Sequence, residues 1–386
     1  MSLKNKRKIL VTTGTRADYG FLRPVLRLIT KSKKLKLYLV VTGTHLSKRH
    51  GCTIIEIQKD GFKIFKTINL IPKNDTNYDM SLALGKGIIY FSKLMKTVNP
   101  DINLIFGDRD EMLVSAITAY HLNIPNAHIH GGDKSKGGID EYNRHAITKM
   151  SNLHFAATKK STQRILKMGE NPKLVFLTGS PVIDEIRMNK ITSKNEIEKK
   201  YKFKLTGDEI LLVQHPVTTQ INQSENQIKN TLTAITKIKK PTIAIAPNSD
   251  AGHKKIFKYL ELYSKRYKFF HLFTNIPHCD YLGFLKNCGV LVGNSSSGMI
   301  EGSYFNTPVV NIGIRQTGRE SGPNVINVSE FKSPLIEKAI IKIMKRNRKS
   351  YKNSFIYGRG LSAIKIVKIL EKIKLDNKLI QKQISM

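Results

Sequence analysis

Short apolar runs alternate with amphipathic stretches along this chain, and this alternation is the feature that most constrains its fold. In the first half, the amphipathic stretches 22–30 and 112–122 lie between apolar runs. The apolar runs of this half are residues 8–12, 37–42, 102–106 and 126–130. Strands that alternate with helices in this way form a parallel sheet with helices on both faces. The sequence therefore predicts an α/β fold.

The second half repeats the pattern, with apolar runs at residues 210–213, 242–246, 289–292 and 309–312. The chain has 386 residues, which is more than one domain usually holds. We expect a boundary near residues 175–195, with one domain over 1–180 and another over 181–360. Residues 361–386 are expected to form a helix that returns toward the first domain, and then a polar tail that frays after Leu375.

Polar and glycine-rich segments follow the carboxyl ends of the apolar runs in both halves. In the first half these segments are GTRADYG, TGTH, GDRDE and HIHGGD, and in the second half they are QHP, PNSDAG, GNSSSG and GIRQTGRE. Ligands of open parallel sheets bind at this edge. Two such sheets that face each other would line a cleft, and the sequence predicts the functional site there.

The composition is strongly basic, with 65 Lys and Arg residues against 29 Asp and Glu and a net charge of +36. A nucleic-acid-binding protein is one hypothesis for this charge, and salt-sensitive binding to random duplex would support it. The basic residues are spread along the whole chain instead of forming one stripe. We therefore favour a solvated basic surface that attracts an anionic substrate, with no nucleic-acid partner.

Cysteine usage and hydropathy indicate a soluble cytoplasmic protein. Cys52, Cys279 and Cys288 have no metal-binding spacing and form no even disulfide framework. The first apolar run is too short for a signal peptide, and none approaches the roughly 20 residues that span a bilayer. We expect no membrane partner.

The segment GNSSSG, residues 293–298, is the best candidate for an anion site. Ser295 and Ser296 stand where a helix is expected to begin, and free N–H groups at such an end attract phosphate. Glu301, further along this helix, could accept hydrogen bonds from ribose hydroxyls. The alternatives are an ordinary serine cap and a solvated glutamate.

Arg16, Arg109 and Arg315 each lie in a loop with glycine nearby, just after a predicted strand. Guanidinium groups in such loops can bind phosphate with two hydrogen bonds. Any one of them taken alone is more often a surface residue. Three at strand ends favour a phosphorylated ligand.

Six residues are candidates for proton transfer, and each has a structural alternative. Asp140 and Glu141 precede a predicted helix, where Asp140 would also serve as a helix cap. His215 follows a strand and could instead be a buried, hydrogen-bonded histidine. The full set is Asp108, His130, Asp140, Glu141, His145 and His215.

The sequence predicts neither a metal nor a redox cofactor. His128, His130 and Asp133 lack a fourth ligand at a suitable spacing. The first strand is not followed by the glycine pattern of a dinucleotide-binding turn, and no phosphate-binding P-loop motif is present.

The motifs taken together resemble one enzyme family over roughly residues 7–375, the hydrolysing UDP-N-acetylglucosamine 2-epimerases. This family includes the bacterial sialic-acid enzymes and the epimerase half of the animal bifunctional enzyme. The motifs, in chain order, are GTRADYG, GTHL, GDRDE, HIHGGD, IDEYNRHAITKMS, QHPVTT, PNSDAG, GNSSSGMIE and NIGIRQTGRESG.

The resemblance implies a GT-B-like architecture, in which two Rossmann-like domains face a central cleft, and it implies no metal or cofactor. A homo-oligomer, either a dimer or a tetramer, is expected. Asp108, Asp140 and His215 are the implied catalytic groups, with Glu141 and His130 as further candidates. The implied contacts to the UDP-sugar are Arg16, His45, Arg109, Asn248, Ser295, Ser296, Glu301 and Arg315, to which His215 would add a contact to UDP.

The implied reaction converts UDP-N-acetylglucosamine and water into N-acetylmannosamine and UDP, for sialic-acid-type biosynthesis. A carboxylate removes the C2 proton while UDP departs, which gives a glycal, and water then adds to the double bond. Ser295, Ser296 and Arg315 would stabilise the charge that builds on the departing diphosphate.

The chain departs from well-known family members in two places. Their HIEGGE-like segment reads HIHGGD here, so that His130 replaces an acidic residue, and one extra residue precedes Asp140. Gly20 also stands where a serine is common. The first change is compatible with another substrate, a UDP-2,4-diacetamido-2,4,6-trideoxyglucose on the route to legionaminic acid. A GT-B glycosyltransferase is a further alternative, which has no need of an acid/base set at C2.

Overall fold

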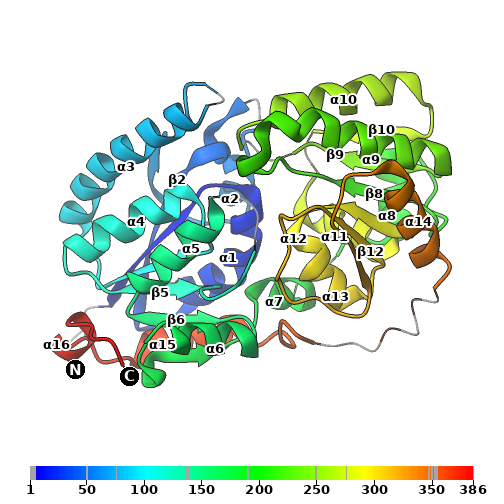
Figure 1. Cartoon of the computed structure of the whole chain (residues 1–386). Helices are drawn as coiled ribbons and strands as arrows, with labels where there is room; N and C mark the ends of the chain where they lie inside the picture. Colours follow the sequence, from blue (N-terminus) through cyan, green and yellow to red (C-terminus); the bar gives the residue numbers. More distant parts are fainter. Residues whose placement is uncertain are drawn as a thin grey trace. The chain divides into compact units, whose positions relative to one another are not determined.

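The computed structural model describes residues 6–48, 51–74, 76–135, 139–188, 191–247, 250–274, 276–346, 348, 351 and 355–385. The described chain divides into two compact units. The first unit contains Met1–Asp133, Asp140–Met188 and Tyr357–Met386, and the second contains Lys134–Ile139 and Asn189–Ile356. The chain therefore leaves the first unit for the second and returns to the first at its C-terminal end (Figure 1).

The described part of the first unit is built on a seven-stranded parallel sheet, ordered β3-β2-β1-β4-β5-β6-β7. Its strands are β1 (Arg7–Thr13), β2 (Leu35–Thr42), β3 (Ile64–Ile68), β4 (Ile102–Phe106), β5 (Asn126–Ile129), β6 (Leu153–Ala156) and β7 (Val175–Leu177). Strand order reverses between β1 and β4, and the loops after these strands therefore open at a topological switch point.

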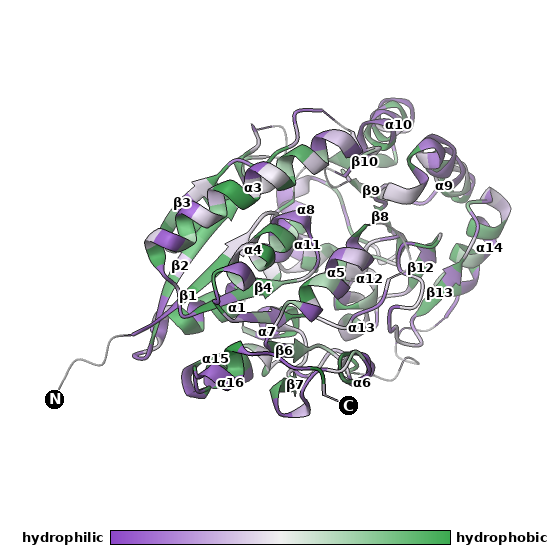
Figure 2. Cartoon of the chain, turned by 60° about the vertical axis from the view of Figure 1, so that its left-hand side comes forward, coloured by the Kyte–Doolittle hydropathy of each residue, from purple (hydrophilic) through white to green (hydrophobic). Residues whose placement is uncertain are grey.

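Helices cover both faces of this sheet, as the sequence predicts (Figure 1). The helices are α1 (Arg16–Lys31), α2 (Ile54–Lys59), α3 (Asn77–Val98), α4 (Asp110–His121), α5 (Asp140–Lys149), α6 (Lys159–Lys167), α7 (Pro181–Met188), α15 (Ser362–Lys372) and α16 (Asn377–Ile380), with 3-10 turns η1 (Gly43–Leu46) and η3 (Pro172–Leu174). Apolar residues of α1 and α15 pack on one face, and those of α3 and α4 pack on the other. Strand β2 is largely green in the hydropathy view of Figure 2, and its last four residues are buried, as are the last five of β1.

The segment after Leu375 is folded, and the prediction of a frayed tail is wrong. Leu379 of α16 is buried in the core of the first unit. The Lys382 Nζ lies 2.6 Å from the buried carboxylate of Glu170, which also lies 3.0 Å from the His154 Nε2. Burial disfavours the charged form of Glu170, but these hydrogen bonds outweigh it and lower its pKa to about 2. The tail is polar in sequence, and its fraying was predicted for that reason. The buried partner of Lys382, Glu170, becomes evident only in the folded structure.

The described part of the second unit contains a six-stranded parallel sheet, ordered β10-β9-β8-β11-β12-β13. Its strands are β8 (Ile210–Val213), β9 (Thr242–Ile245), β10 (Phe270–Phe273), β11 (Val290–Gly293), β12 (Val309–Ile312) and β13 (Val325–Val328). Its helices are α8 (Lys194–Tyr201), α9 (Ser224–Ile238), α10 (His253–Arg266), α11 (His278–Asn287), α12 (Ser296–Met299), α13 (Glu301–Phe305) and α14 (Ser333–Met344), with the 3-10 segment η4 (Thr218–Gln223). Apolar residues of α9, α10 and α14 pack with the strands in one core. The strand order again reverses at the centre, between β8 and β11.

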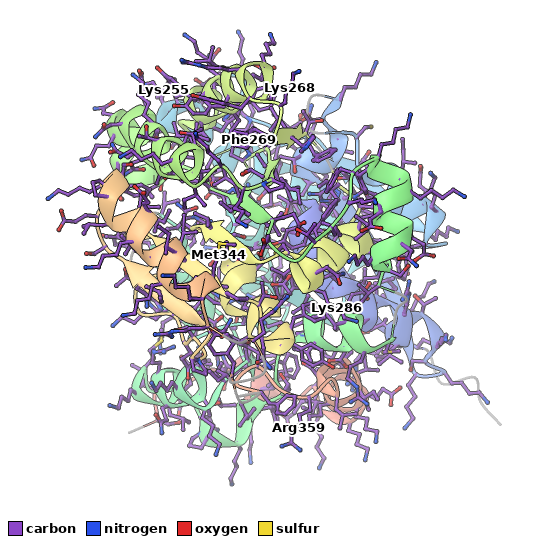
Figure 3. The ribbon with its side chains drawn as sticks, turned by 90° about the vertical axis from the view of Figure 1, so that its right-hand side faces the viewer. Lys255, Lys268, Phe269, Lys286, Met344 and Arg359 are labelled. Atoms are coloured by element: carbon purple, nitrogen blue, oxygen red, sulfur yellow. The ribbon has the colours of Figure 1, made fainter. Side chains whose placement is uncertain are left out.

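Basic residues lie on separate parts of the surface. In Figure 3, Lys255 is on α10, Lys268 follows that helix and Lys286 is on α11, and all three are exposed. Among the described residues, we find no helix that is both long and apolar enough to cross a membrane.

Candidate active site

The loop after β1 is fixed by a capping box at the start of α1. The Asp18 carboxylate accepts hydrogen bonds from the backbone N–H groups of Gly14 and Thr15, at 2.8 and 2.7 Å. Asp18 and Thr15 thereby satisfy N–H groups that a helix start leaves without partners. Arg16, a predicted ligand of UDP, is the first residue of α1 and is half-buried.

His45 lies in η1, just after β2, and is fully buried. Its Nε2 is 3.0 Å from the Thr13 Oγ1 and its Nδ1 is 2.7 Å from the Thr53 Oγ1. Burial lowers the pKa of His45 to about 3, so the ring is neutral at pH 7. In this structure, His45 connects the end of β1 with the start of α2, and its contact with the substrate stays a prediction.

The loop after β4 carries Asp108 and Arg109. Gly107 has a positive φ of 74°, which lets the chain turn sharply at the end of the strand. Arg109 precedes α4, and its Nε lies 3.3 Å from the Glu111 carboxylate. The Asp108 carboxylate contacts the guanidinium of Arg144 on α5.

Helix α5 brings further acidic groups to this guanidinium. Asp140 is the first residue of the helix, and Glu141 is the second. Glu141 contacts Arg144 through one carboxylate oxygen, while the other lies 3.0 Å from the Nε2 of His145. The structure therefore brings Asp108 and Glu141, two of the predicted catalytic residues, to one buried arginine. Asp140 lies on the same helical turn as Glu141.

His130 follows β5 and has a left-handed backbone conformation, with φ of 66°. Its Nδ1 is 2.9 Å from an Asp133 carboxylate oxygen, and its Nε2 is 2.8 Å from the Ser180 Oγ. The rings of Phe21 and Phe106 flank the imidazole. His130 is 4% exposed. Both of its ring nitrogens have hydrogen-bond partners inside the first unit.

In the second unit, Asn294 holds the loop that contains His215. Strand β11 lies beside β8, and Gly293 is paired with Val213. The Asn294 side chain accepts a hydrogen bond from the His215 N–H at 2.7 Å and donates one to the His215 carbonyl at 2.9 Å. One buried amide side chain thereby fixes the position of the predicted catalytic histidine.

The serine segment departs from the single helix predicted for it. It forms two short helices, α12 and α13, and Glu301 begins the second of them. A four-residue helix adds little to an anion site through its dipole, because the dipole sums over aligned peptides. Hydroxyl groups are the more important feature: the Ser295 Oγ is 3.0 Å from the Ser297 Oγ, which also contacts the Tyr281 hydroxyl. Ser296 is half-buried in the first turn of α12.

Glu301 is 3% exposed, and one of its carboxylate oxygens lies 3.9 Å from the His278 Nε2. The other, Oε2, has no hydrogen-bond partner among the described residues. A buried carboxylate oxygen without a donor is costly, and an unpaired polar atom of this kind indicates a polar ligand. The hydroxyl groups of a ribose are suitable donors.

Arg315 lies in the turn after β12 and donates to the Asn294 carbonyl at 3.2 Å. The Gln316 side chain donates to the same carbonyl at 3.1 Å. Arg315, Asn294 and the serine segment are thus in one local arrangement. Asn248, another predicted ligand of UDP, lies outside the described residues.

Gly293 provides a test of how strictly this arrangement depends on backbone geometry. Its φ is 134°, and a Cβ at this position would collide with the Val213 carbonyl of the neighbouring strand. We expect Gly293→Ala to lower the free energy of unfolding by about 2–4 kcal/mol and to weaken UDP binding. Urea denaturation and calorimetry would measure the two effects.

The matched control for this substitution is Gly207→Ala, in the same unit. Gly207 also has a positive φ, 91°, but the nearest atom to its added Cβ is 4.0 Å away. Its substitution is expected to cost about 1 kcal/mol and to leave UDP affinity unchanged. Equal effects at the two positions would contradict the steric argument at Gly293.

The sequence does not single out every residue of these arrangements, and Arg144, Asn294, His278 and Tyr281 are examples. Arg144 and Asn294 lie inside the motifs IDEYNRHAITK and GNSSSG, close to the predicted residues Glu141 and Ser295. His278 and Tyr281 are one helical turn apart on α11, outside every motif. For these two, the sequence contains no signal except their spacing.

A comparison with protein families finds a match to UDP-N-acetylglucosamine 2-epimerase over residues 27–371. The chain belongs to this family. The family predicted from the motifs is therefore confirmed.

Two relatives within the epimerase family cover most of the chain. The UDP-N,N'-diacetylbacillosamine 2-epimerase (hydrolyzing) of Legionella pneumophila is 36% identical over 378 residues, which are 97% of this chain and 98% of the relative. The GDP/UDP-N,N'-diacetylbacillosamine 2-epimerase (hydrolyzing) of Campylobacter jejuni is 34% identical over 325 residues, 84% of each chain.

A solved epimerase structure has the same fold. The Methanocaldococcus jannaschii UDP-GlcNAc 2-epimerase, in complex with UDP-GlcNAc and UDP, superposes with a TM-score of 0.80. Its sequence identity is 20%, and the superposition covers 94% of this chain and 99% of that one. The prediction of a GT-B-like fold with two Rossmann-like domains is confirmed.

Proposed function

We propose that this epimerase hydrolyses a UDP-N-acetylhexosamine with inversion at C2, releasing UDP and a free manno-configured sugar. The observation that carries the proposal is the group of acidic residues at the carboxyl edge of the first sheet. There, Asp108 and Glu141 contact the buried Arg144. Asp140 begins α5, the helix that carries Glu141 and Arg144. Abstraction of a non-acidic C2 proton requires a positioned base of this kind.

The first unit would act on the sugar. In the elimination step, a carboxylate of Asp140 or Asp108 takes the C2 proton while the bond between C1 and the diphosphate oxygen breaks. The electron pair of the C2–H bond becomes the double bond of a glycal, and UDP leaves with the bridging oxygen. Water then adds its hydroxyl at C1, and C2 receives a proton on the opposite face. Glu141 and His130 are the further candidates for these proton transfers.

The second unit would bind UDP. The hydroxyls of Ser295 and Ser296 and the Arg315 guanidinium are suited to the diphosphate, where charge builds as the C1–O bond breaks. The unpaired Oε2 of Glu301 would accept hydrogen bonds from the ribose. His215, held by Asn294, completes this set together with Asn248. Arg16, Arg109 and His45 are the proposed contacts from the first unit.

The proposed substrate is UDP-N,N'-diacetylbacillosamine, which is a UDP-2,4-diacetamido-2,4,6-trideoxyglucose. Both relatives described above carry this sugar in their names, and they cover 97% and 84% of this chain. UDP-N-acetylglucosamine, which is bound in the M. jannaschii structure, is the second candidate. We further propose a cytoplasmic homo-oligomer that acts on this small molecule alone.

Incubation with each UDP-sugar in heavy water tests the reaction. We expect NMR to show free UDP and a manno-configured sugar with one deuteron at C2, formed faster from the diacetamido substrate. In water labelled with ¹⁸O, the released UDP should stay unlabelled, because the C1–O bond breaks. A gluco-configured product without deuterium would indicate simple hydrolysis, and label in UDP would indicate P–O cleavage; either result contradicts the mechanism.

A further inference from the structure

We propose that Arg144 is a positioning residue that holds Asp108 and Glu141 as oriented carboxylates for the chemistry at C2. This inference rests on the proposed function, because it concerns the same reacting groups. Arg144 is not among the residues that the sequence assigns to catalysis or to substrate binding.

The geometry shows that Arg144 acts through other residues. Its side chain is 2% exposed, so the guanidinium is enclosed by protein. One terminal nitrogen contacts Asp108, and the other contacts Glu141 and lies 3.3 Å from the Asp133 carbonyl. The three partners come from the loop after β4, helix α5 and the loop after β5. A single planar group therefore fixes three segments relative to one another.

The charged and titratable groups around this guanidinium come from every element packed against it. Burial disfavours the charged form of Arg144, but the carboxylates of Asp108, Asp133 and Glu141 outweigh burial and raise its pKa above the ordinary value. His128 lies close by with its pKa lowered to about 3, mainly by burial, and is neutral at pH 7. Among the described residues these groups include Asp108 after β4, His128 on β5, Asp133 after β5 and Glu141 on α5. Asp110 of α4 is hydrogen-bonded to Asn143, and His145 of α5 is hydrogen-bonded to Glu141.

A permanent positive charge at this point has a defined effect on the carboxylates. It favours their ionised form, which is the form that accepts a proton. A buried ion pair seldom adds stability compared with apolar packing, because desolvation offsets the attraction. The presence of a buried arginine with two acidic partners is therefore better explained by its effect on those acids than by stability.

Arg144 also connects the acidic pair to the altered HIHGGD segment. The backbone carbonyl of Asp133 accepts a hydrogen bond from Arg144. The Asp133 carboxylate accepts one from the Ser161 hydroxyl at 2.7 Å and also pairs with His130. The position of His130 thus depends on the same loop that Arg144 holds.

Two substitutions test this role, Arg144→Lys and Arg144→Met. Lysine keeps the charge but cannot make the forked contact, whereas methionine removes the charge. We expect kcat to fall about 10-fold in Arg144→Lys and about 30-fold in Arg144→Met, with less than a threefold change in KM. The acidic limb of the pH–rate profile should move up by about one pH unit in Arg144→Met, and less in Arg144→Lys. UDP affinity, measured by calorimetry, should not change.

Arg23→Met is the matched control for the loss of a buried arginine. Arg23 is 12% exposed and pairs with Asp60 at 3.1 Å and with Glu185, also in the first unit. The Arg23→Met substitution should lower the melting temperature and leave the pH–rate profile unchanged. If Arg144→Met does not fold, Arg144→Lys carries the test.

Carboxyl NMR titration of the substrate-free protein separates this inference from the proposed function. Resonances of Asp108 and Glu141 should titrate at higher pH in the Arg144 variants, even if neither UDP-sugar proves to be a substrate. Unchanged carboxyl titration, or an acidic limb that stays at its wild-type pH, would overturn the role of Arg144. Failure of the wild-type enzyme to release UDP would instead overturn the proposed function.

Discussion

Exchange of Asp140 for asparagine is expected to lower turnover by about 10²-fold or more, with little change in the fold. Asparagine is nearly as good as aspartate at a helix start, so α5 should still begin at this residue. The amide has the shape of the carboxylate but cannot take the C2 proton. UDP affinity should persist, because the diphosphate is assigned to residues of the second unit. Steady-state kinetics, thermal unfolding and calorimetry of UDP binding would measure the three properties.

Asp79→Asn is the control for removing a carboxylate from a helix start. Asp79 lies in the first turn of α3, where the Thr76 hydroxyl accepts a hydrogen bond from its N–H. Both variants should lose a similar, small amount of stability, and only Asp140→Asn should lose turnover. If Asp140→Asn were as active as Asp79→Asn, the residue would be a helix-start group and the base would be Asp108, Glu141 or His130.

Mild acid is expected to destabilise the protein strongly, because burial lowers the pKa of three enclosed histidines, His45, His128 and His154. Burial lowers the pKa of both His45 and His128 to about 3. In the unfolded chain both imidazoles would titrate near pH 6.5. Below that pH, and above about pH 3, His45 and His128 are protonated in the unfolded state but not in the folded state. Their stabilising contribution is complete above pH 6.5 and is lost progressively as the pH falls toward 3. Each histidine contributes a slope of about 1.4 kcal/mol per pH unit, and at pH 4.5 the pair would cost about 5 kcal/mol.

That loss is comparable with the whole stability of many domains, and it should be visible in urea unfolding curves recorded from pH 7 to pH 4.5. His45→Gln should reduce the slope by about 1.4 kcal/mol per pH unit, even if it also lowers stability at pH 7. His121 is exposed at the end of α4, and His121→Gln should leave the slope unchanged. A free energy of unfolding that stays constant between pH 6.5 and pH 4.5 would contradict the neutral, buried state of the two rings.

The central strands of both sheets were predictable from the sequence, whereas several outer ones were not. Strands β4, β8 and β12 have the predicted bounds, because a strand buried on both faces is a continuous apolar run. The outermost strands β3 and β13 are mostly exposed or half-buried, and polar residues interrupt their apolar pattern. Strand β6 contains His154, whose buried partner Glu170 is distant in the sequence. Tertiary contacts thus define the strands that local hydropathy misses.

The candidate site was predictable as a set of loops but not as a set of contacts. Strand ends indicate where Asp108, Arg109 and Arg315 lie, because ligand-binding loops gather at that edge of a parallel sheet. The same reasoning could not show that the rings of His45 and His130 have hydrogen-bonded partners on both nitrogens. It also could not show the two hydrogen bonds between the Asn294 side chain and the His215 backbone, because such pairing depends on how separate segments meet.

The return of the chain to its first unit affects the order in which the protein can fold during synthesis. Helix α15 supplies Ile366 and Leu370 to the same core as Leu22 and Leu26 of α1. A ribosome must therefore complete residues 189–356 before the first unit receives its C-terminal core helices, α15 and α16. The second unit has its full sequence by then and can close while its neighbour still exposes the apolar surface of α1. The N-terminal unit is thus translated first but can complete its core only after the second unit, so its apolar surface stays exposed for longer during synthesis.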